Sequence, residues 1–230
     1  MHVRRLIGSL LATTLAATAL TAVATSAPAS AATTVPTRVT IQVSQKKAEY
    51  NDKISVTGSV QGQNSDGTWG TLPYGSGSAT LQFLPKGSST WKSLQSEADG
   101  NTFYFYPVPV KATGTLRVVY SGGTYGDYQF TPSTSSSKSL KVTRKLTYKE
   151  VPGRRTGIQG KISPAARIKV VIQKKVGKKY RHFKTVKTAR SGKFKIILPA
   201  PRNGRFYWKI TFTGNKTFVP RVVKGSTYSY

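Results

Sequence analysis

The chain has 230 residues and no cysteine, and its 36 Lys and Arg residues against 7 Asp and Glu residues make a net charge of +29. The absence of cysteine excludes disulfides, thiol catalysis and a lipid-modified cysteine anchor. The scarcity of carboxylates argues against hydrolysis by paired acids, and so basic a chain is expected to meet anionic partners.

The N-terminus has the order of parts of a secretory signal peptide. Arg4 and Arg5 form a positive start, residues 6–24 are apolar, and the A-S-A of residues 29–31 is a small-residue cleavage site. The alternative is an N-terminal membrane anchor, which the Ala and Thr content of the apolar run and the cleavage site disfavour. We therefore expect residues 1–31 to be removed, and we find no later apolar run long enough to form a transmembrane segment.

Short segments rich in β-branched and aromatic residues follow, separated by Gly, Ser, Pro and Asn. No helical period is present, so the pattern predicts an all-β fold. Seven strands in about 100 residues is the count typical of an immunoglobulin-like β-sandwich. The predicted strands are Thr37–Val43, Lys53–Ser59, Ser78–Leu84, Thr90–Ser96, Asn101–Pro107, Gly114–Tyr120 and Ser136–Val142.

The second half of the chain repeats the motifs of the first in the same order. Ile54–Val60 is matched by Thr156–Ile162, and further pairs of strands and turns follow. An order of matches this long predicts an internal repeat. We therefore predict two tandem immunoglobulin-like β-sandwich domains, at residues 32–143 and 144–230, joined near Thr143–Leu146.

The end of the first copy is similar to a known group of proteins. Residues 114–137, GTLRVVYSGGTYGDYQFTPSTSSS, resemble the end of bacterial extracellular immunoglobulin-like repeats, as in secreted proteins of the actinobacterial type. The second copy keeps Gly204, Phe212, Gly214 and Phe218 but replaces the Ser/Thr stretch with VPRVVKGSTYSY. The resemblance implies a β-sandwich outside the cell, and it brings no catalytic residues.

The residues themselves predict no enzyme. After removal of the signal peptide the one histidine is His182, and its neighbours Lys179, Arg181 and Lys184 supply no carboxylate to orient it. No His/Cys pair has the spacing of metal ligands, and no glycine-rich loop precedes a helix, so we expect no catalytic residue, no cofactor and no metal. The run Asp99–Asn101 predicts a hairpin turn rather than a calcium loop.

Most aromatic residues occupy strand positions, which favours core packing over a sugar-stacking platform. The expected core aromatics are Trp91, Phe103, Phe105, Tyr120, Tyr180, Phe194, Phe206, Trp208 and Phe212. Trp69 differs because it lies in the Gly-, Ser- and Asn-rich loop of residues 61–78. Its ring could stack on a ligand or fold back to cap the sandwich, and the sequence leaves both open.

Basic residues concentrate in the second copy, where 24 of them stand against Glu150 alone. Alternation sends many of them outward, and neighbouring strands lie about 4.8 Å apart, so we expect one broad positive surface. Tyr180 and Phe183 cannot share one face of a regular strand, which predicts either a bulge or an aromatic side chain lying along the sheet edge. The candidate polyanion-binding residues are Lys174, Lys175, Lys178, Lys179, Arg181, Lys184, Lys187, Arg190, Lys193 and Lys195.

Two interpretations of this surface compete. It is either a solvated strand face whose lysines guard a sheet edge, or a polyanion-binding surface, and the second explains better why carboxylates are nearly missing. Outside a cell, anionic cell-wall polymers and acidic polysaccharides are the expected partners, ahead of nucleic acid. The leading hypothesis is a secreted, non-enzymatic protein retained on the cell envelope through its basic second domain.

Two other functions stay open. A protein-binding adhesin or inhibitor would use the loop of residues 61–78 to hold a protein partner. A cationic antimicrobial or nucleic-acid-binding effector would use the basic second copy.

Overall fold

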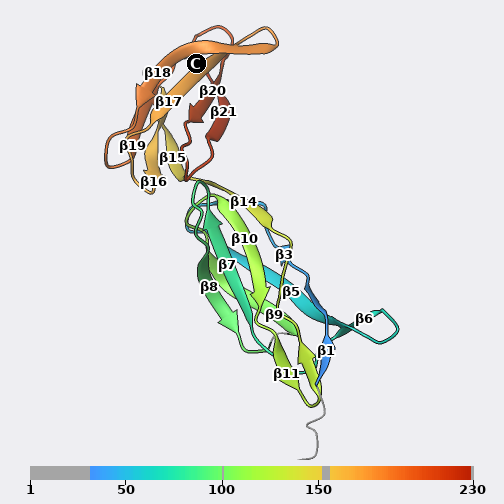
Figure 1. Cartoon of the computed structure of the whole chain (residues 1–230). Coiled ribbons are helices and arrows are strands. Elements are labelled where there is room, and N and C mark those ends of the chain that lie inside the picture. Colours follow the sequence, from blue (N-terminus) through green and yellow to red (C-terminus); the bar gives the residue numbers. More distant parts are fainter. Residues whose placement is uncertain (1–31, 100, 152–155, 229–230) are drawn as a thin grey trace, which may run out of the picture. The chain divides into compact units, whose positions relative to one another are not determined.

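The computed structural model describes residues 32–99, 101–151 and 156–228 of the chain. Within these ranges every helix or strand assigned is a β-strand, which confirms the all-β prediction (Figure 1). The same residues contain no helix of the length and apolar character needed to cross a membrane. The predicted signal peptide and Gly100 of the predicted hairpin turn lie outside the described residues.

Strands β1 to β14 lie between residues 33 and 143, which we call the N-terminal half. All seven strands predicted there are present, with ends shifted by a few residues and the first one split into β2 and β3. The bounds are β1 Thr33–Val35, β2 Thr37–Val39, β3 Gln42–Val43, β4 Lys47–Glu49, β5 Lys53–Gln63, β6 Trp69–Thr71, β7 Ala79–Pro85, β8 Lys92–Glu97, β9 Thr102–Pro109, β10 Gly114–Tyr120, β11 Gly123–Tyr125, β12 Tyr128–Phe130, β13 Ser133–Thr134 and β14 Lys138–Thr143.

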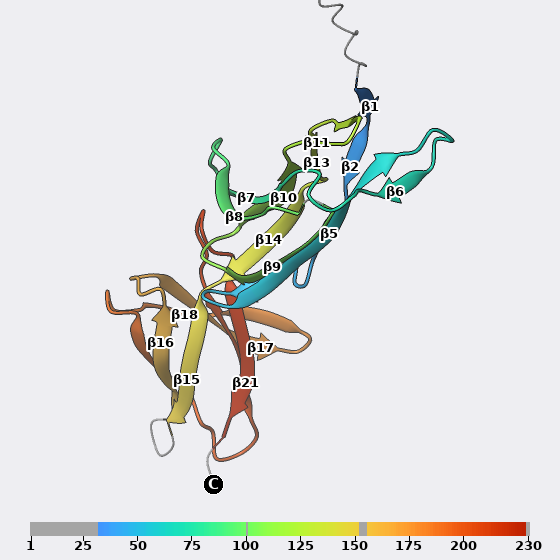
Figure 2. The ribbon, with the colours of Figure 1, turned by 90° about the horizontal axis from the view of Figure 1, so that it is seen from below.

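The N-terminal half has the strand order of an immunoglobulin-like sandwich. One sheet runs β4-β14-β10-β7-β8, with β13 beside β10. In the other sheet, β5 is the central strand and pairs with β2, β3, β6 and β9; Figure 2 shows β5 and β9 side by side. A small third sheet has the order β1-β12-β11. Of the seven predicted strands, the third, sixth and seventh (β7, β10 and β14) share one sheet, and the second and fifth (β5 and β9) lie in the other. This division is typical of the immunoglobulin-like fold.

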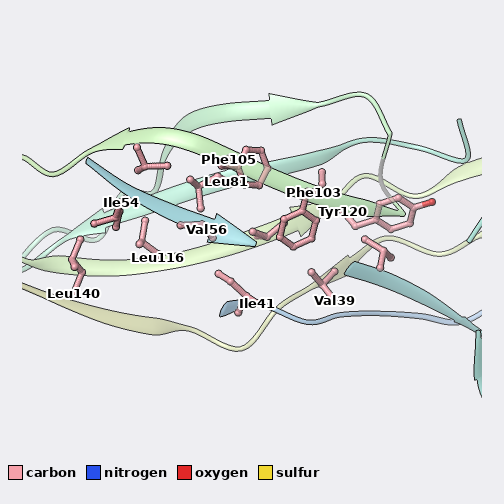
Figure 3. Packing of buried hydrophobic residues seen from close by; sticks show 14 of the residues in the cluster. Val39, Ile41, Ile54, Val56, Leu81, Phe103, Phe105, Leu116, Tyr120 and Leu140 are labelled. Carbon is pink, nitrogen blue, oxygen red and sulfur yellow. The ribbon is translucent and has the colours of Figure 1, made fainter. Parts of the chain in front are cut away.

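A single hydrophobic cluster fills the space between these two sheets (Figure 3). Ile54, Val56 and Phe105 enter it from one sheet, and Leu81 and Leu116 from the other. Full burial of a side chain of this size contributes about 1.5–3 kcal/mol. The cluster therefore explains how the N-terminal half is stabilised without disulfides.

Residues 145–227, the C-terminal half, form two further sheets with the orders β15-β16-β19 and β18-β17-β20-β21. Side chains of both sheets meet in a second hydrophobic cluster. Residues 32–230 nevertheless form one compact unit, so the division into two tandem domains stays a prediction. The strands are β15 Lys145–Val151, β16 Gly157–Ser163, β17 Lys169–Val176, β18 Lys179–Lys187, β19 Lys193–Ile197, β20 Phe206–Phe212 and β21 Arg221–Thr227.

Arg144 is the single residue between β14 and β15. It is 7% exposed, its guanidinium lies 4.4 Å above the ring of Phe218, and it donates a 2.7 Å hydrogen bond to the carbonyl of Pro164. Burial lowers the pKa of Arg144. Nearby, Arg221 and Glu49 form a 2.8 Å ion pair, the one such pair within the residues that the structure describes.

The aromatic core prediction is confirmed for six residues and wrong for two. Trp91 precedes β8 and is half-buried beneath the guanidinium of Arg117, 4.0 Å from its ring. Tyr180 is half-buried on the outer face of its sheet, as described below. Phe206 is half-buried and packs against the core. The six buried aromatics are Phe103, Phe105, Tyr120, Phe194, Trp208 and Phe212.

A substitution at Tyr120 tests how much one buried hydrogen bond of the N-terminal half contributes to stability. It is fully buried, which raises its pKa, and its hydroxyl donates a 2.6 Å hydrogen bond to the carbonyl of Ser76. We expect Tyr120→Phe to lower the free energy of unfolding by about 1 kcal/mol, since a buried carbonyl loses its donor. Urea denaturation measures this, and Tyr128→Phe, at an exposed position, is the control. Equal effects of the two substitutions would contradict the role of the buried hydroxyl.

Candidate anion-binding surfaces

The ten candidate polyanion-binding residues do not form one broad surface, so that prediction is wrong. Strands β17 and β18 pair in the four-stranded sheet, whereas β19 pairs with β16 in the other sheet. The chain changes sheets between β18 and β19 so that Phe194 and Ile196 enter the core from the opposite layer. The candidates therefore fall into two groups, with Lys184 apart from both.

The first group lies on the β17–β18 hairpin, drawn in orange in Figure 1. Gly177 has a φ of 58°, which allows the strands to be joined by a two-residue turn, with Val176 opposite Lys179. All the basic side chains of this hairpin group are exposed. The hairpin group consists of Lys174, Lys175, Lys178, Lys179 and Arg181.

The predicted bulge is confirmed in β18. Consecutive residues of β17 pair with residues of β18 that are two apart, Ile172 with Lys184 and Gln173 with His182, so Phe183 is the extra residue of β18. The extra residue allows Phe183 and Val186, three positions apart, both to pack against the core.

Tyrosine rings and lysine ammonium groups lie together on the outer face of the four-stranded sheet. The ammonium of Lys175 is 5.5 Å from the ring of Tyr207, and those of Lys209 and Lys224 are 5.2 and 5.7 Å from the ring of Tyr180. Such contacts contribute about 0.5–1 kcal/mol at exposed sites. We call these five residues the Tyr–Lys face. Sequence reasoning missed Lys209 and Lys224 because they lie beyond residues 174–195, the range that holds the candidate residues. Alternation with the buried Trp208 and Ile210 nevertheless predicts that Lys209 points outward.

Like charges face each other across several strand pairs of the C-terminal half. In antiparallel strands, directly opposite residues have Cβ atoms about 4.5–5.5 Å apart, and like charges at that separation are destabilising. The acidic residue Glu150 lies opposite Ile158 and not opposite a base. The like-charge pairs are Lys161 with Lys193, Lys169 with Lys187, Lys174 with Arg181, and Lys209 with Lys224.

The second group of candidates lines a hollow of about 490 Å³ where β18 is followed by β19. Lys187 ends β18, Arg190 lies in the turn, and Lys193 and Lys195 extend from β19. Arg167 completes the basic lining, and sequence reasoning missed it because it lies two residues before β17, outside residues 174–195 that hold the other candidates. Thr188, Ala189 and Phe194 are the uncharged lining residues of this corner hollow.

Thr188 connects two walls of the corner hollow. Its side chain is buried, and its hydroxyl donates a 2.6 Å hydrogen bond to the carbonyl of Ala166. The same hydroxyl accepts a 2.9 Å hydrogen bond from the N–H of Ile168. These bonds hold the backbone on both sides of Arg167 against the end of β18.

Lys184 has a different role from the other candidates. It is half-buried, and its ammonium donates a hydrogen bond to the carbonyl of Ile197 on β19. The bond joins the edge strands of the two sheets, so one of the three donors of this ammonium stabilises the fold.

The described residues include no group of three or more His, Asp or Glu side chains that could hold a metal ion. His182 is exposed, and its Nε2 lies 3.0 Å from the hydroxyl of Thr185. The imidazole thus contacts a hydroxyl on its own strand and not a carboxylate that could orient it for catalysis.

Trp69 lies on a strand and not in the open loop that the sequence predicts. Strand β5 continues to Gln63, which pairs with Trp69 at the start of β6. The guanidinium of Arg38 lies 4.4 Å from the ring centre, so one face of the indole is covered by the protein itself. Ligand stacking by Trp69 stays a prediction.

The sequence matches no protein-family model and no curated protein. Among solved structures, a DUF4785 family protein from Legionella pneumophila is 15% identical to this chain, with a TM-score of 0.38. The match covers 82% of this chain and 55% of that protein, so this chain spans about half the length of that protein. The human OSCAR ligand-binding domain is 12% identical with a TM-score of 0.25, over 82% of this chain and 97% of that one. The FN1–FN3 domains of chicken CNTN1 are 10% identical with a TM-score of 0.24, over 86% and 65%.

Proposed function

We propose that the protein is a secreted, non-enzymatic binding protein that attaches to anionic polymers of the cell envelope through residues 144–230. The observation that carries this proposal is the set of four like-charge pairs directly opposite each other on neighbouring strands. A sheet selected only for stability would place opposite charges at such positions, where each pair contributes about 0.2–1 kcal/mol. A polyanion supplies the countercharge that the chain lacks.

The distribution of the basic residues favours a polymer over one small ligand. The hairpin group and the Tyr–Lys face belong to the four-stranded sheet, while Lys161, Lys193 and Lys195 extend from the three-stranded sheet. The hairpin group and the Tyr–Lys face lie outside the lining of the corner hollow, so one small ligand in that hollow would leave most of these charges without a partner. A flexible chain with repeated negative charges can contact several of these groups at once, and its binding weakens steeply with salt as counterions compete.

Retention on cells tests the attachment. We expect the protein to stay on intact producing cells at about 50 mM NaCl and to be released at about 500 mM, since the Debye length falls from roughly 14 to 4 Å over that range. Immunoblots of the wash fractions measure the release. A neutral detergent wash at low salt is the control, and release that does not depend on salt would contradict electrostatic attachment.

Reversing one charge of a like-charge pair tests whether these pairs lower the stability of the protein but strengthen its attachment to the cell envelope. Lys161→Glu places a carboxylate opposite Lys193, and we expect the free energy of unfolding to rise by about 0.5 kcal/mol while retention on cells weakens. Urea denaturation and the salt-wash assay measure the two effects. Lys92→Glu is the matched control, because Lys92 is exposed on β8 and pairs with the uncharged Phe83.

We expect the control to change neither stability nor retention. If Lys161→Glu stabilises the protein without weakening retention, the lysines are only a solvated face and the proposal fails.

A further inference from the structure

The corner hollow differs from the other basic surfaces because five basic residues border one open depression. Five cationic side chains, those of Arg167, Lys187, Arg190, Lys193 and Lys195, line one concave volume of about 490 Å³, and its lining contains no acidic residue. The hairpin group and the Tyr–Lys face instead present their charges on a turn and on a sheet surface. Concave, like-charged linings concentrate the field and hence the local density of counterions.

The five cations come from three separate segments. Arg167 belongs to the connection before β17, Lys187 and Arg190 to the end of β18 and its turn, and Lys193 and Lys195 to β19. Basic residues from three segments around one hollow can contact a compact ligand together, whereas charges spaced along one strand suit an extended ligand.

The chemistry of the lining favours phosphate. Arg167 and Arg190 offer planar guanidinium forks, which match two oxygens of a phosphate and bind them by paired hydrogen bonds. A phosphomonoester has a charge of about −1.5 to −2 and three acceptor oxygens, and a diphosphate has more, whereas a carboxylate has one charge and two oxygens. Group for group, a phosphate therefore offsets more of the positive charge of the five cations than a carboxylate does.

We infer that the corner hollow binds a phosphomonoester or diphosphate group together with part of the sugar or polyol unit that bears it. This inference rests on the proposed function and names the chemistry of one contact within it. The volume lies inside the range of small-ligand sites, about 300–1,000 Å³, and exceeds what a single phosphate fills. Thr188 is a positioning residue, because it fixes the backbone that presents Arg167.

Calorimetric titration of the whole protein with sodium pyrophosphate tests the inference. We expect one equivalent to bind, and tricarballylate, a compact tricarboxylate, to bind at least tenfold more weakly. The double variant Arg167→Gln, Arg190→Gln should weaken pyrophosphate binding more than tenfold, since it removes two charge-assisted contacts. Lys178→Gln, Lys179→Gln removes the same charge from the hairpin group and should change the affinity less than twofold.

Thr188→Val separates positioning from charge. It keeps every cation and nearly the same side-chain volume but loses both hydroxyl bonds, so we expect pyrophosphate affinity to fall several-fold while the circular dichroism spectrum is unchanged. A second arm compares dissolved glycerol 1-phosphate with vesicles that contain phosphatidic acid. Binding of the former indicates a polymer end group, and binding of the latter alone indicates a lipid headgroup.

Equal affinity for tricarballylate, or equal losses in the two double variants, would show general attraction and overturn the site. Absence of pyrophosphate binding would do the same. These outcomes are separate from the salt-wash assay. If retention on cells stays salt-dependent while pyrophosphate fails to bind, the phosphate site alone is wrong, and if pyrophosphate binds while retention ignores salt, polymer attachment alone is wrong.

Discussion

Repulsion among cations is the constraint on which the C-terminal half depends. With 24 basic residues against one acidic residue between residues 144 and 230, internal ion pairs cannot balance the charge. Stability must therefore come from packing, and the buried side chains of both sheets form a continuous cluster in which Ile172, Ile210 and Phe212 are almost fully excluded from water. Because the core occupies one face of every strand, the cations are confined to outer faces, turns and the edges between sheets.

The edges of the two C-terminal sheets are where basic residues from several segments gather. Strands β18 and β19 are successive in the chain but lie at the edges of different sheets, so the turn between them crosses from one layer to the other. At that crossing Arg167, Arg190 and the lysines next to them meet from three segments. The flat faces offer charge at regular spacing, and the crossing offers it in a concave shape. The proposed polymer contact would use the flat faces, and the proposed phosphate contact would use the crossing.

Alternation of residue types was enough to predict the strands, the inward aromatic residues such as Phe194, and the bulge near Phe183. It was not enough to predict sheet membership, because a period of two tells which face of a strand is buried and not which neighbour the strand has. For that reason Lys193 is expected on the same positive surface as Lys174 and is found in the opposite sheet. Arg167 could not be found from sequence, since a hollow depends on contacts between distant segments.

The four-stranded sheet ends at β18 and β21, and both edges expose backbone groups that another strand could pair with. The edge strand β18 carries the exposed Lys179 and Arg181, and repulsion between such charges opposes pairing of two copies at this edge. A polyanion that covers these side chains removes that protection. If the protein binds a polyanion as proposed, the same lysines that hold it there also keep its sheet edges apart, so binding and protection against aggregation draw on one set of charges.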